Sequence, residues 1–395
     1  MKILVAMSGG VDSTVTAHIL KKQGYEVVGV HFNFVGGEAC EPELEDIAHT
    51  LGIKIIYCDF RSEFRDKIIK SFVEDYERGI TPNPCAICNA TMKFEKLLEV
   101  MKEENCNMVA TGHYANIDIV GADTTIGAKL ASPHRYCIKK STNQQKDQPY
   151  MLYRLNQEQL SHIIFPLSNM DKTDVRKIAT ELNLKVANKK DSQDVCFIND
   201  TDYKEFIKRY EFGDDYKEKI ARGLLKEEEI LSRPYFKKGE FVDLEGNVLG
   251  FHNGIINYTI GQRKGLNIAF GERKFVVRID AEKNQVILGG NDDLMSSDFT
   301  IRDVVYSGHD ENVIGKKFYA KLRYRHDGTL CEIVGANACG ALVGADTIRP
   351  RRMGELREPN ILTCHLSSPV RAITPGQSAV FYDEDGRVMF GGIII

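Results

Sequence analysis

An alternation of short apolar runs with amphipathic segments in the first half of the chain limits its fold most strongly. Apolar runs predict buried strands at 2–7, 26–32, 53–58 and 107–111, and helical patterns follow at 13–22, 41–51, 62–76 and 91–104. This alternation predicts a parallel sheet with helices on both faces. Ligands of such sheets bind beyond the carboxyl ends of the strands. The segments that directly follow the strands are therefore the first candidates for a functional site.

The rest of the chain changes character twice. Residues 202–231 resemble charged helices, and after Pro234 short alternating runs separated by glycines indicate an antiparallel barrel or sandwich. A chain of 395 residues is also expected to form two or three domains. We therefore predict an α/β domain with a parallel sheet over 1–203, a small connecting domain over 204–275 and a C-terminal antiparallel β-barrel over 276–395. The segments 211–238 and 335–359 receive no role.

Composition and charge narrow the class of protein. No run approaches the ~18 consecutive apolar residues that a membrane helix needs. The chain starts with a strand-like run and lacks the features of a signal peptide, so we expect a cytosolic protein without membrane contacts. The net charge of −4 offers no bulk attraction for nucleic acid, and any contact with RNA requires a local basic surface.

A glycine-rich loop, Ser8-Gly9-Gly10-Val11-Asp12-Ser13, joins the first predicted strand to the first predicted helix. Its glycines permit a tight turn, and the amides at the helix start suit an anion. No Gly-Lys-Ser/Thr follows, so it is not the loop of a kinase-type ATPase. It is similar to the S-G-G-x-D-S loop of PP-loop ATP pyrophosphatases, which form adenylates. Asp12 would bind a metal ion on the phosphates or cap the helix, and the alternative is a plain glycine turn.

Three of the ten cysteines stand out from the others. Cys85 and Cys88 form a Cys-x-x-Cys pair, which in a reducing compartment indicates metal or redox chemistry. The prolines at 82 and 84 predict an ordered loop there, ahead of a helix whose N-terminus would favour the thiolates. Half of a zinc site is the alternative, although no second ligand pair has the right spacing. Cys196 follows two lysines at 189–190, and on its own it is most simply a buried core thiol.

These residues belong to a longer series of motifs that resembles the bacterial tRNA-specific 2-thiouridylases, a family that thiolates the wobble uridine of certain tRNAs. The similarity rests on MSGGVDS, GITPNPCAICN, ATGHYA, KDQPYMLY, KKDSQDVCFI, HNGIINYTIGQRKGL, LRYR and ITPGQSAVFY, which occur in the order of the family and span residues 7–382. KDQPYMLY and TIGQRKGL are more specific than the glycine-rich loop.

The resemblance implies a role for each matching residue. The ATP site would comprise Ala6, Met7, Ser8, Gly9, Gly10, Val11, Asp12, Ser13, Phe32 and Gly112. The tRNA would contact Asn83, Pro84, Cys85, Lys146, Asp147, Gln148, Arg323 and Tyr324. Cys88 would be the nucleophilic cysteine, and Cys196 would carry a persulfide. Without the resemblance, 146–148 is most simply a solvated loop and 323–324 part of a barrel strand.

The implied reaction needs ATP, Mg²⁺, tRNA and a sulfur donor, either a cysteine desulfurase or a sulfur-relay protein. Adenylation of the uracil 2-oxygen would create a good leaving group, and a sulfur nucleophile would then attack the carbon. The persulfide on Cys196 would supply the sulfur, and Cys88 would release it by disulfide exchange. Because the two cysteines are far apart in the sequence, their proximity is a prediction.

One departure from the family pattern leaves two mechanisms open. The common motif has Asp where this chain has Cys85. Cys85, Cys88 and Cys196 would then ligate three irons of a [4Fe-4S] cluster, as in cluster-bearing thiolases with the same ATP loop. Two rival functions remain as well. An amide ligase with this loop would need no cysteine, and the intact loop at 8–13 argues against a non-catalytic tRNA-binding protein.

Overall fold

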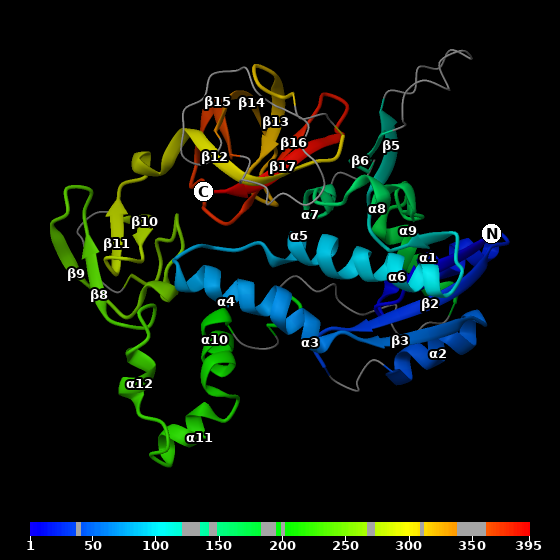
Figure 1. Cartoon of the computed structure of the whole chain (residues 1–395), viewed down its shortest axis with the longest axis horizontal. Helices are drawn as coiled ribbons and strands as arrows, with labels where there is room; N and C mark the ends of the chain where they lie inside the picture. Colours follow the sequence, from blue (N-terminus) through cyan, green and yellow to red (C-terminus); the bar gives the residue numbers. More distant parts are fainter. Residues whose placement is uncertain are drawn as a thin grey trace.

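The computed structural model describes residues 1–36, 41–120, 135–141, 148–182, 195–198, 202–266, 273–308, 312–337 and 361–395. Over these ranges the chain builds a parallel α/β domain, a helical and β middle region, and a closed β-barrel (Figure 1). None of the described helices has both the length and the apolar character required to cross a membrane.

The N-terminal domain is organised around a five-stranded parallel sheet, which confirms the predicted fold class. Its strands run in the order β3-β2-β1-β4-β7. They comprise β1 (Lys2–Ala6), β2 (Glu26–Asn33), β3 (Lys54–Asp59), β4 (Met108–Ala110) and β7 (Ile163–Ile164). The order reverses between β1 and β4, and the carboxyl ends of those two strands therefore flank the usual ligand crevice of an open α/β sheet.

Helices cover both faces of this sheet. Alternate residues of β1 divide between the two cores, because Ile3 and Val5 belong to one and Leu4 to the other. The Ile3 side is covered by α1 (Val11–Lys22), α2 (Glu41–Leu51) and α9 (Lys172–Glu181). The Leu4 side is covered by α6 (Glu95–Glu103), α7 (Pro149–Leu152) and α8 (Gln157–Ser161). Burial on both faces explains why the strands are almost continuously apolar.

Two long helices pass beside the sheet toward the middle region (Figure 1). One joins α3 (Arg61–Phe64), η1 (Arg65–Ile69) and α4 (Lys70–Glu77), and the other joins α5 (Pro84–Cys88), η2 (Asn89–Phe94) and α6. The second helix starts at Pro84, whereas the sequence predicted a loop up to residue 91. The prediction was wrong because proline suits the first position of a helix, where its missing N–H is not needed.

The middle region contains three helices and a four-stranded sheet. The helices are α10 (Tyr203–Phe212), α11 (Tyr216–Ala221) and α12 (Glu227–Leu231). The sheet has the order β10-β11-β8-β9, with β8 (Gly239–Val242), β9 (Val248–His252), β10 (Phe275–Asp280) and β11 (Gln285–Gly289), and a short helix η4 (Ile255–Asn257) follows β9. The predicted boundary at 275 assigns β10 and β11 to the barrel, but the structure pairs β11 with β8. An alternating strand pattern does not reveal its pairing partner.

A closed antiparallel barrel completes the chain, as the sequence predicted. The strand order around it is β12-β15-β14-β13-β16-β17. The strands are β12 (Met295–Tyr306), β13 (Lys317–Lys321), β14 (Thr329–Asn337), β15 (Ile361–Arg371), β16 (Ser378–Tyr382) and β17 (Val388–Ile394), and η5 (Asp292–Leu294) precedes them. A hairpin of β5 (Asn116–Val120) and β6 (Arg135–Lys139) links this barrel to the N-terminal domain through an ion pair of Arg387 with Asp118, at 2.8 Å.

Candidate active site

The glycine-rich loop lies at the carboxyl end of β1 and leads directly into α1. Gly9 has a φ of +70°, which a residue with a side chain rarely adopts. The Ser13 hydroxyl closes the loop, because its Oγ accepts from the Ser8 amide at 3.2 Å and donates to the Gly10 carbonyl at 3.1 Å. No side chain caps the N-terminus of α1. The fold therefore leaves the start of this helix available for an anion at the sheet's ligand crevice.

Asp12 is not a helix cap, contrary to one of the two roles predicted for it. Its carboxylate accepts hydrogen bonds from Lys172 Nζ, at 2.7 Å to each oxygen, and from the Tyr114 hydroxyl at 2.9 Å. The charge of Asp12 is thus compensated within the protein. Lys172 opens α9, and nothing in its sequence context indicated this pairing.

Gly112 and the loop make a close backbone contact. A Cβ at Gly112 would lie 2.8 Å from the backbone carbon of Asp12 and 3.0 Å from the Ser13 amide nitrogen. Only glycine fits without displacing the loop. The structure therefore brings Gly112, which follows β4, against the loop that follows β1, as the predicted ATP site requires.

Two other predicted contacts lie close to this crevice. Phe32, near the end of β2, packs edge-to-face on Phe60 with ring centroids 5.3 Å apart. The side-chain oxygen of Gln148, a predicted tRNA contact, accepts a hydrogen bond from the Tyr114 amide. Gln148 therefore lies beside the ATP loop. Lys146 and Asp147 lie outside the described residues.

The three predicted thiols share one electrostatic environment. Cys85 and Cys88 lie in the first turns of the helix that starts at Pro84, and Cys196 lies in the short segment 195–198. The pKa of Cys88 is raised slightly by both Cys85 and Cys196, and Cys85 raises that of Cys196. Such influence requires short separations. Cys88 also packs in one hydrophobic cluster with Phe197, the residue after Cys196, so the segment that contains Cys196 lies beside the cysteine helix.

Burial keeps these thiols protonated. It raises the pKa of Cys88 to about 12 and also raises the pKa of Cys85. The pKa of Cys196 is raised too, because the protein packed around its sulfur displaces water even though the residue keeps exposed surface. The sequence predicted the opposite shift from the helix N-terminus, and the cost of placing a thiolate in this poorly solvated site outweighs that effect. Lys93, one turn beyond the pair, is the cation that lowers the pKa of all three thiols.

Solvent reaches the three thiols unequally. Cys196 is exposed, Cys85 is half-buried and Cys88 is buried. An exposed cysteine is accessible to a second protein, whereas a buried one reacts only with groups inside the site. Within the described ranges, no set of three or more His, Cys, Asp and Glu side chains is arranged to hold a metal ion, so the zinc alternative has no support there.

The predicted tRNA contacts from distant parts of the sequence converge beside the cysteine helix. Asn83 directly precedes this helix and donates through Nδ2 to Ser378 Oγ of the barrel at 3.1 Å. Tyr324 and Arg323 lie in the turn after β13, rather than inside a barrel strand. The Tyr324 ring meets Tyr150 edge-to-face at 6.1 Å, and the Tyr150 hydroxyl donates to the Ser378 carbonyl at 2.8 Å.

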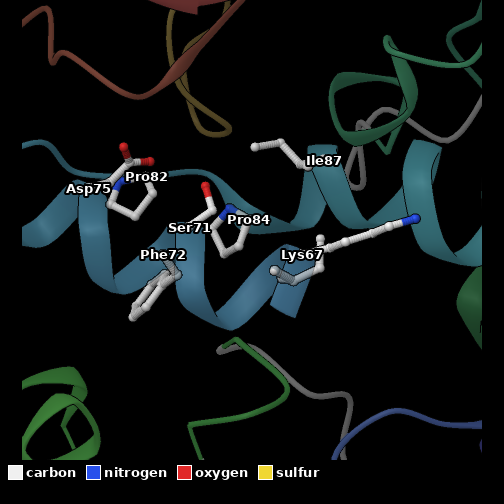
Figure 2. A pocket seen from close by; sticks show the side chains of 8 residues that line it. Lys67, Ser71, Phe72, Asp75, Pro82, Pro84 and Ile87 are labelled. Carbon is white, nitrogen blue, oxygen red and sulfur yellow. The ribbon is translucent and has the colours of Figure 1, made fainter. Parts of the chain in front are cut away.

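A shallow pocket adjoins the other side of this segment. Figure 2 shows Pro82, Pro84 and Ile87 opposite side chains of the helix that contains α4. Those side chains are Lys67, Ile68, Ser71, Phe72 and Asp75. The pocket holds about 210 Å³ of space, part of it open to solvent. The segment with the cysteines therefore lies between α4 and the barrel.

His113 has a structural role. Burial lowers its pKa to about 3, and its Nδ1 is hydrogen-bonded to Thr111 Oγ1 at 2.8 Å. A neutral imidazole between Phe94 and Phe165 fills the core. Sequence reasoning missed Lys172 and Lys93, which lie outside the quoted motifs, and gave no role to Tyr114, which lies within ATGHYA.

Three family models match the chain. They are described as the tRNA methyl transferase HUP domain over residues 1–200, the tRNA methyl transferase PRC-barrel domain over 229–290 and the aminomethyltransferase beta-barrel domain over 354–395. The match to the PRC-barrel domain ends at 290, after β11, in agreement with the strand pairing described above.

The sequence similarity to known proteins covers the whole chain. A tRNA-specific 2-thiouridylase MnmA from Acetivibrio thermocellus is 40% identical over 407 residues, covering 100% of this chain and 99% of that protein. One from Clostridioides difficile is 37% identical over 405 residues, covering 100% and 98%. A solved U34-tRNA thiolase, NcsA from Methanococcus maripaludis with its [4Fe-4S] cluster, is 19% identical with a TM-score of 0.31, covering 58% of this chain and 72% of that one. A likeness this weak carries no weight for the cofactor of this chain.

Proposed function

The chain belongs to the tRNA-specific 2-thiouridylase family, and we propose that it uses ATP to replace the 2-oxygen of the wobble uridine, U34, of tRNA with sulfur. The observation that carries this proposal is the packing of Phe197, next to Cys196, in one hydrophobic cluster with Cys88. These thiols adjoin segments from all three parts of the chain. An amide ligase or a simple RNA-binding protein has no need for such a group.

The ATP site in this proposal is the loop from Ser8 to Ser13, with Ala6, Met7, Phe32 and Gly112. The uncapped start of α1 would bind the pyrophosphate of ATP while the uridine oxygen receives AMP. Asp12 accepts a hydrogen bond from Lys172 and so holds the lysine side chain next to the loop. Magnesium would enter with the ATP phosphates, and we assign it no protein ligand because the Asp12 carboxylate already has its partners.

Sulfur transfer then proceeds in two steps. The terminal sulfur of a Cys196 persulfide attacks C2 of the adenylated uridine, and AMP leaves with the former 2-oxygen. The tRNA is now joined to Cys196 through a disulfide. Cys88 attacks the Cys196 sulfur, a Cys88–Cys196 disulfide forms, and 2-thiouridine is released. An external thiol must then reduce this disulfide before the next turnover.

The burial pattern supports this division of roles. Cys196 is exposed and accessible to a sulfur donor, which would be a cysteine desulfurase or a relay protein. Cys88 is buried, and its raised pKa keeps it a neutral thiol until the exchange step. A neutral Cys88 does not compete with the persulfide for the activated uridine.

The alternative mechanism requires Cys85, Cys88 and Cys196 to ligate a [4Fe-4S] cluster. As described above, these side chains do not form a metal-binding group in the structure. The arrangement therefore does not fit the cluster, and we derive no step through it. We expect protein purified without oxygen to thiolate tRNA after treatment with an iron chelator. About four irons per chain, lost together with activity in Cys85→Ala, would contradict this expectation.

The alkylation rate of Cys88 should depend on pH and on the charge of Lys93. Below its raised pKa, the thiolate fraction of Cys88 grows about tenfold per pH unit, so alkylation by iodoacetamide should accelerate about 100-fold between pH 7 and 9. Lys93→Met removes the cation that lowers this pKa, and alkylation should slow at every pH. Peptide mass spectrometry of Cys88 measures both rates. Lys96→Met is the matched control, since Lys96 pairs with Glu63 and Glu99. Equal slowing in both variants would show that Lys93 has no particular effect.

The proposed activity is tested directly by nucleoside mass spectrometry. The purified protein is incubated with ATP, a sulfur donor and a tRNA transcript that carries uridine at the wobble position. We expect 2-thiouridine only when ATP is present, and none in a transcript with cytidine at that position. Absence of 2-thiouridine with every sulfur donor would refute the proposal.

A further inference from the structure

The turn that enters β16 of the barrel holds the segment in front of the cysteine helix. The Thr81 amide donates to the Pro375 carbonyl at 3.2 Å. Gln377 Nε2 donates to the carbonyls of Thr81 and Pro82, at 3.0 and 3.2 Å. Together with the bond from Asn83 to Ser378, these contacts connect three consecutive residues, 81–83, to the barrel.

The prolines make this support necessary. Pro82 and Pro84 have no N–H, so residues 81–84 cannot pair along a regular strand. The carbonyls of Thr81 and Pro82 precede the helix and need donors from elsewhere. The amide group of Gln377 has two N–H donors, one for each carbonyl.

The barrel turn and this segment are in backbone contact. Gly376 has a φ of +89°, and a Cβ there would lie 2.3 Å from Ile80 Cγ2 and 2.7 Å from the Thr81 carbonyl oxygen. The turn itself is fixed to β17, because the Gly376 amide donates to the Ile394 carbonyl and the Ile394 amide donates to the Gln377 carbonyl, both at 2.9 Å. A close contact with a rigid base limits movement of the segment in that direction.

Two further elements restrain the same segment. On the side shown in Figure 2, Pro82, Pro84 and Ile87 lie opposite the helix that contains α4. A Cβ at Gly79 would lie 2.6 Å from Ile279 Cγ2 on β10, so the middle sheet also contacts this segment. All three parts of the chain therefore meet just ahead of Cys85 and Cys88.

We propose that the barrel turn Pro375–Ser378 sets the position of the cysteine helix, with Gln377 as the positioning residue. This inference rests on the proposed function and assigns a step of it to the barrel. Gln377 orients Cys88 for sulfur release through the carbonyls of Thr81 and Pro82. The ATP loop makes none of these contacts, so the ATP site itself should keep its geometry without them. Correct docking of the barrel is thereby a condition for sulfur transfer.

Gln377→Glu tests this role, because it replaces a double donor by a carboxylate that repels both carbonyls. In a single turnover, tRNA-dependent release of pyrophosphate should stay within about threefold of wild type, since, among the described residues, the Gln377 side chain donates to Thr81 and Pro82 and makes no hydrogen bond to the ATP loop. Formation of free 2-thiouridine should fall by about 100-fold, as expected when a reacting group is displaced by about 1 Å. Gln377→Lys retains donors for the carbonyls and should recover most of this loss.

Gln157→Glu is the matched control. Gln157 Nε2 also joins two carbonyls across the same pair of domains, those of Tyr136 and Ser307, at 2.8 Å each. Among the contacts that the structure describes, its side chain makes no hydrogen bond to the segment 81–84, and both activities should be retained in this variant. A second readout is alkylation of Cys88, which should change in Gln377→Glu and not in Gln157→Glu.

Three results would overturn the inference. These are undiminished thiolation in Gln377→Glu, an equal loss of pyrophosphate release and thiolation, or an equal loss of thiolation in the two glutamate variants. If Gln377→Glu does not fold, the double variant Ser378→Ala/Gln377→Leu replaces it. The ratio of thiolation to pyrophosphate release in that variant then tests the inference in the same way. If the wild-type protein releases no pyrophosphate with tRNA, the proposed function itself fails, which is a different outcome.

Discussion

Cys196→Ser is expected to abolish thiolation while leaving the use of ATP intact. Without the persulfide no sulfur reaches the adenylated uridine, and the yield of 2-thiouridine should fall below about 10⁻³ of wild type, as for the loss of a covalent nucleophile. Release of pyrophosphate in a single turnover should remain within about threefold, because the ATP loop is a separate structural unit. Nucleoside mass spectrometry and a pyrophosphate assay on the same sample measure the two quantities.

Cys58→Ser provides the control for this experiment. Cys58 is a half-buried thiol at the end of β3 in the same domain, and no role is assigned to it. It should retain both activities. Thiolation by Cys196→Ser at more than a tenth of the wild-type rate would show that sulfur enters through another group.

Cys88→Ser is expected to trap the tRNA on the protein. The first step needs only the Cys196 persulfide, so AMP should still leave and the tRNA should become joined to Cys196 by a disulfide. Serine cannot complete the exchange, and less than about 1% of the product should be released in one turnover without added thiol. A non-reducing gel with labelled tRNA detects the adduct, and dithiothreitol should release 2-thiouridine from it.

The neighbouring thiol supplies the comparison for that result. Cys85 is half-buried and also close to Cys196, so it is the other candidate for the exchange step. We expect Cys85→Ser to release product without an added thiol. Adduct formation by Cys85→Ser and not by Cys88→Ser would exchange the roles of the two cysteines.

Local patterns in the sequence predicted the fold class, with a parallel sheet in the N-terminal part and a closed barrel in the C-terminal part. Strands such as β1 and β2 are buried on both faces and therefore leave clear apolar runs, and the glycine-rich loop follows directly from its local chemistry. Positions governed by tertiary contacts were predicted less well. Pro84 begins a helix rather than ending a loop, and β10 pairs with the middle sheet, because capping and pairing depend on neighbours distant in the sequence.

The chemistry of the site depended even more on tertiary structure. A helix N-terminus favours a thiolate, but the burial that raises the pKa of Cys88 is created by packing that no local pattern reveals. Lys172 reaches Asp12 from the start of α9, and Gln377 reaches Thr81 from the barrel. Each of these pairs joins residues far apart in the chain. The proximity of Cys196 to Cys88 was implied by the family resemblance rather than by composition or spacing.

The central claim is that ATP activates the 2-oxygen of the wobble uridine and that sulfur then displaces it. A tRNA with ¹⁸O at that oxygen tests this claim most directly. After thiolation by the purified protein, AMP is recovered and its mass is measured. The account predicts one ¹⁸O in AMP for each 2-thiouridine formed, because the oxygen leaves on the adenylate phosphate. Unlabelled AMP together with 2-thiouridine would show that the oxygen departs by another route and would contradict the account.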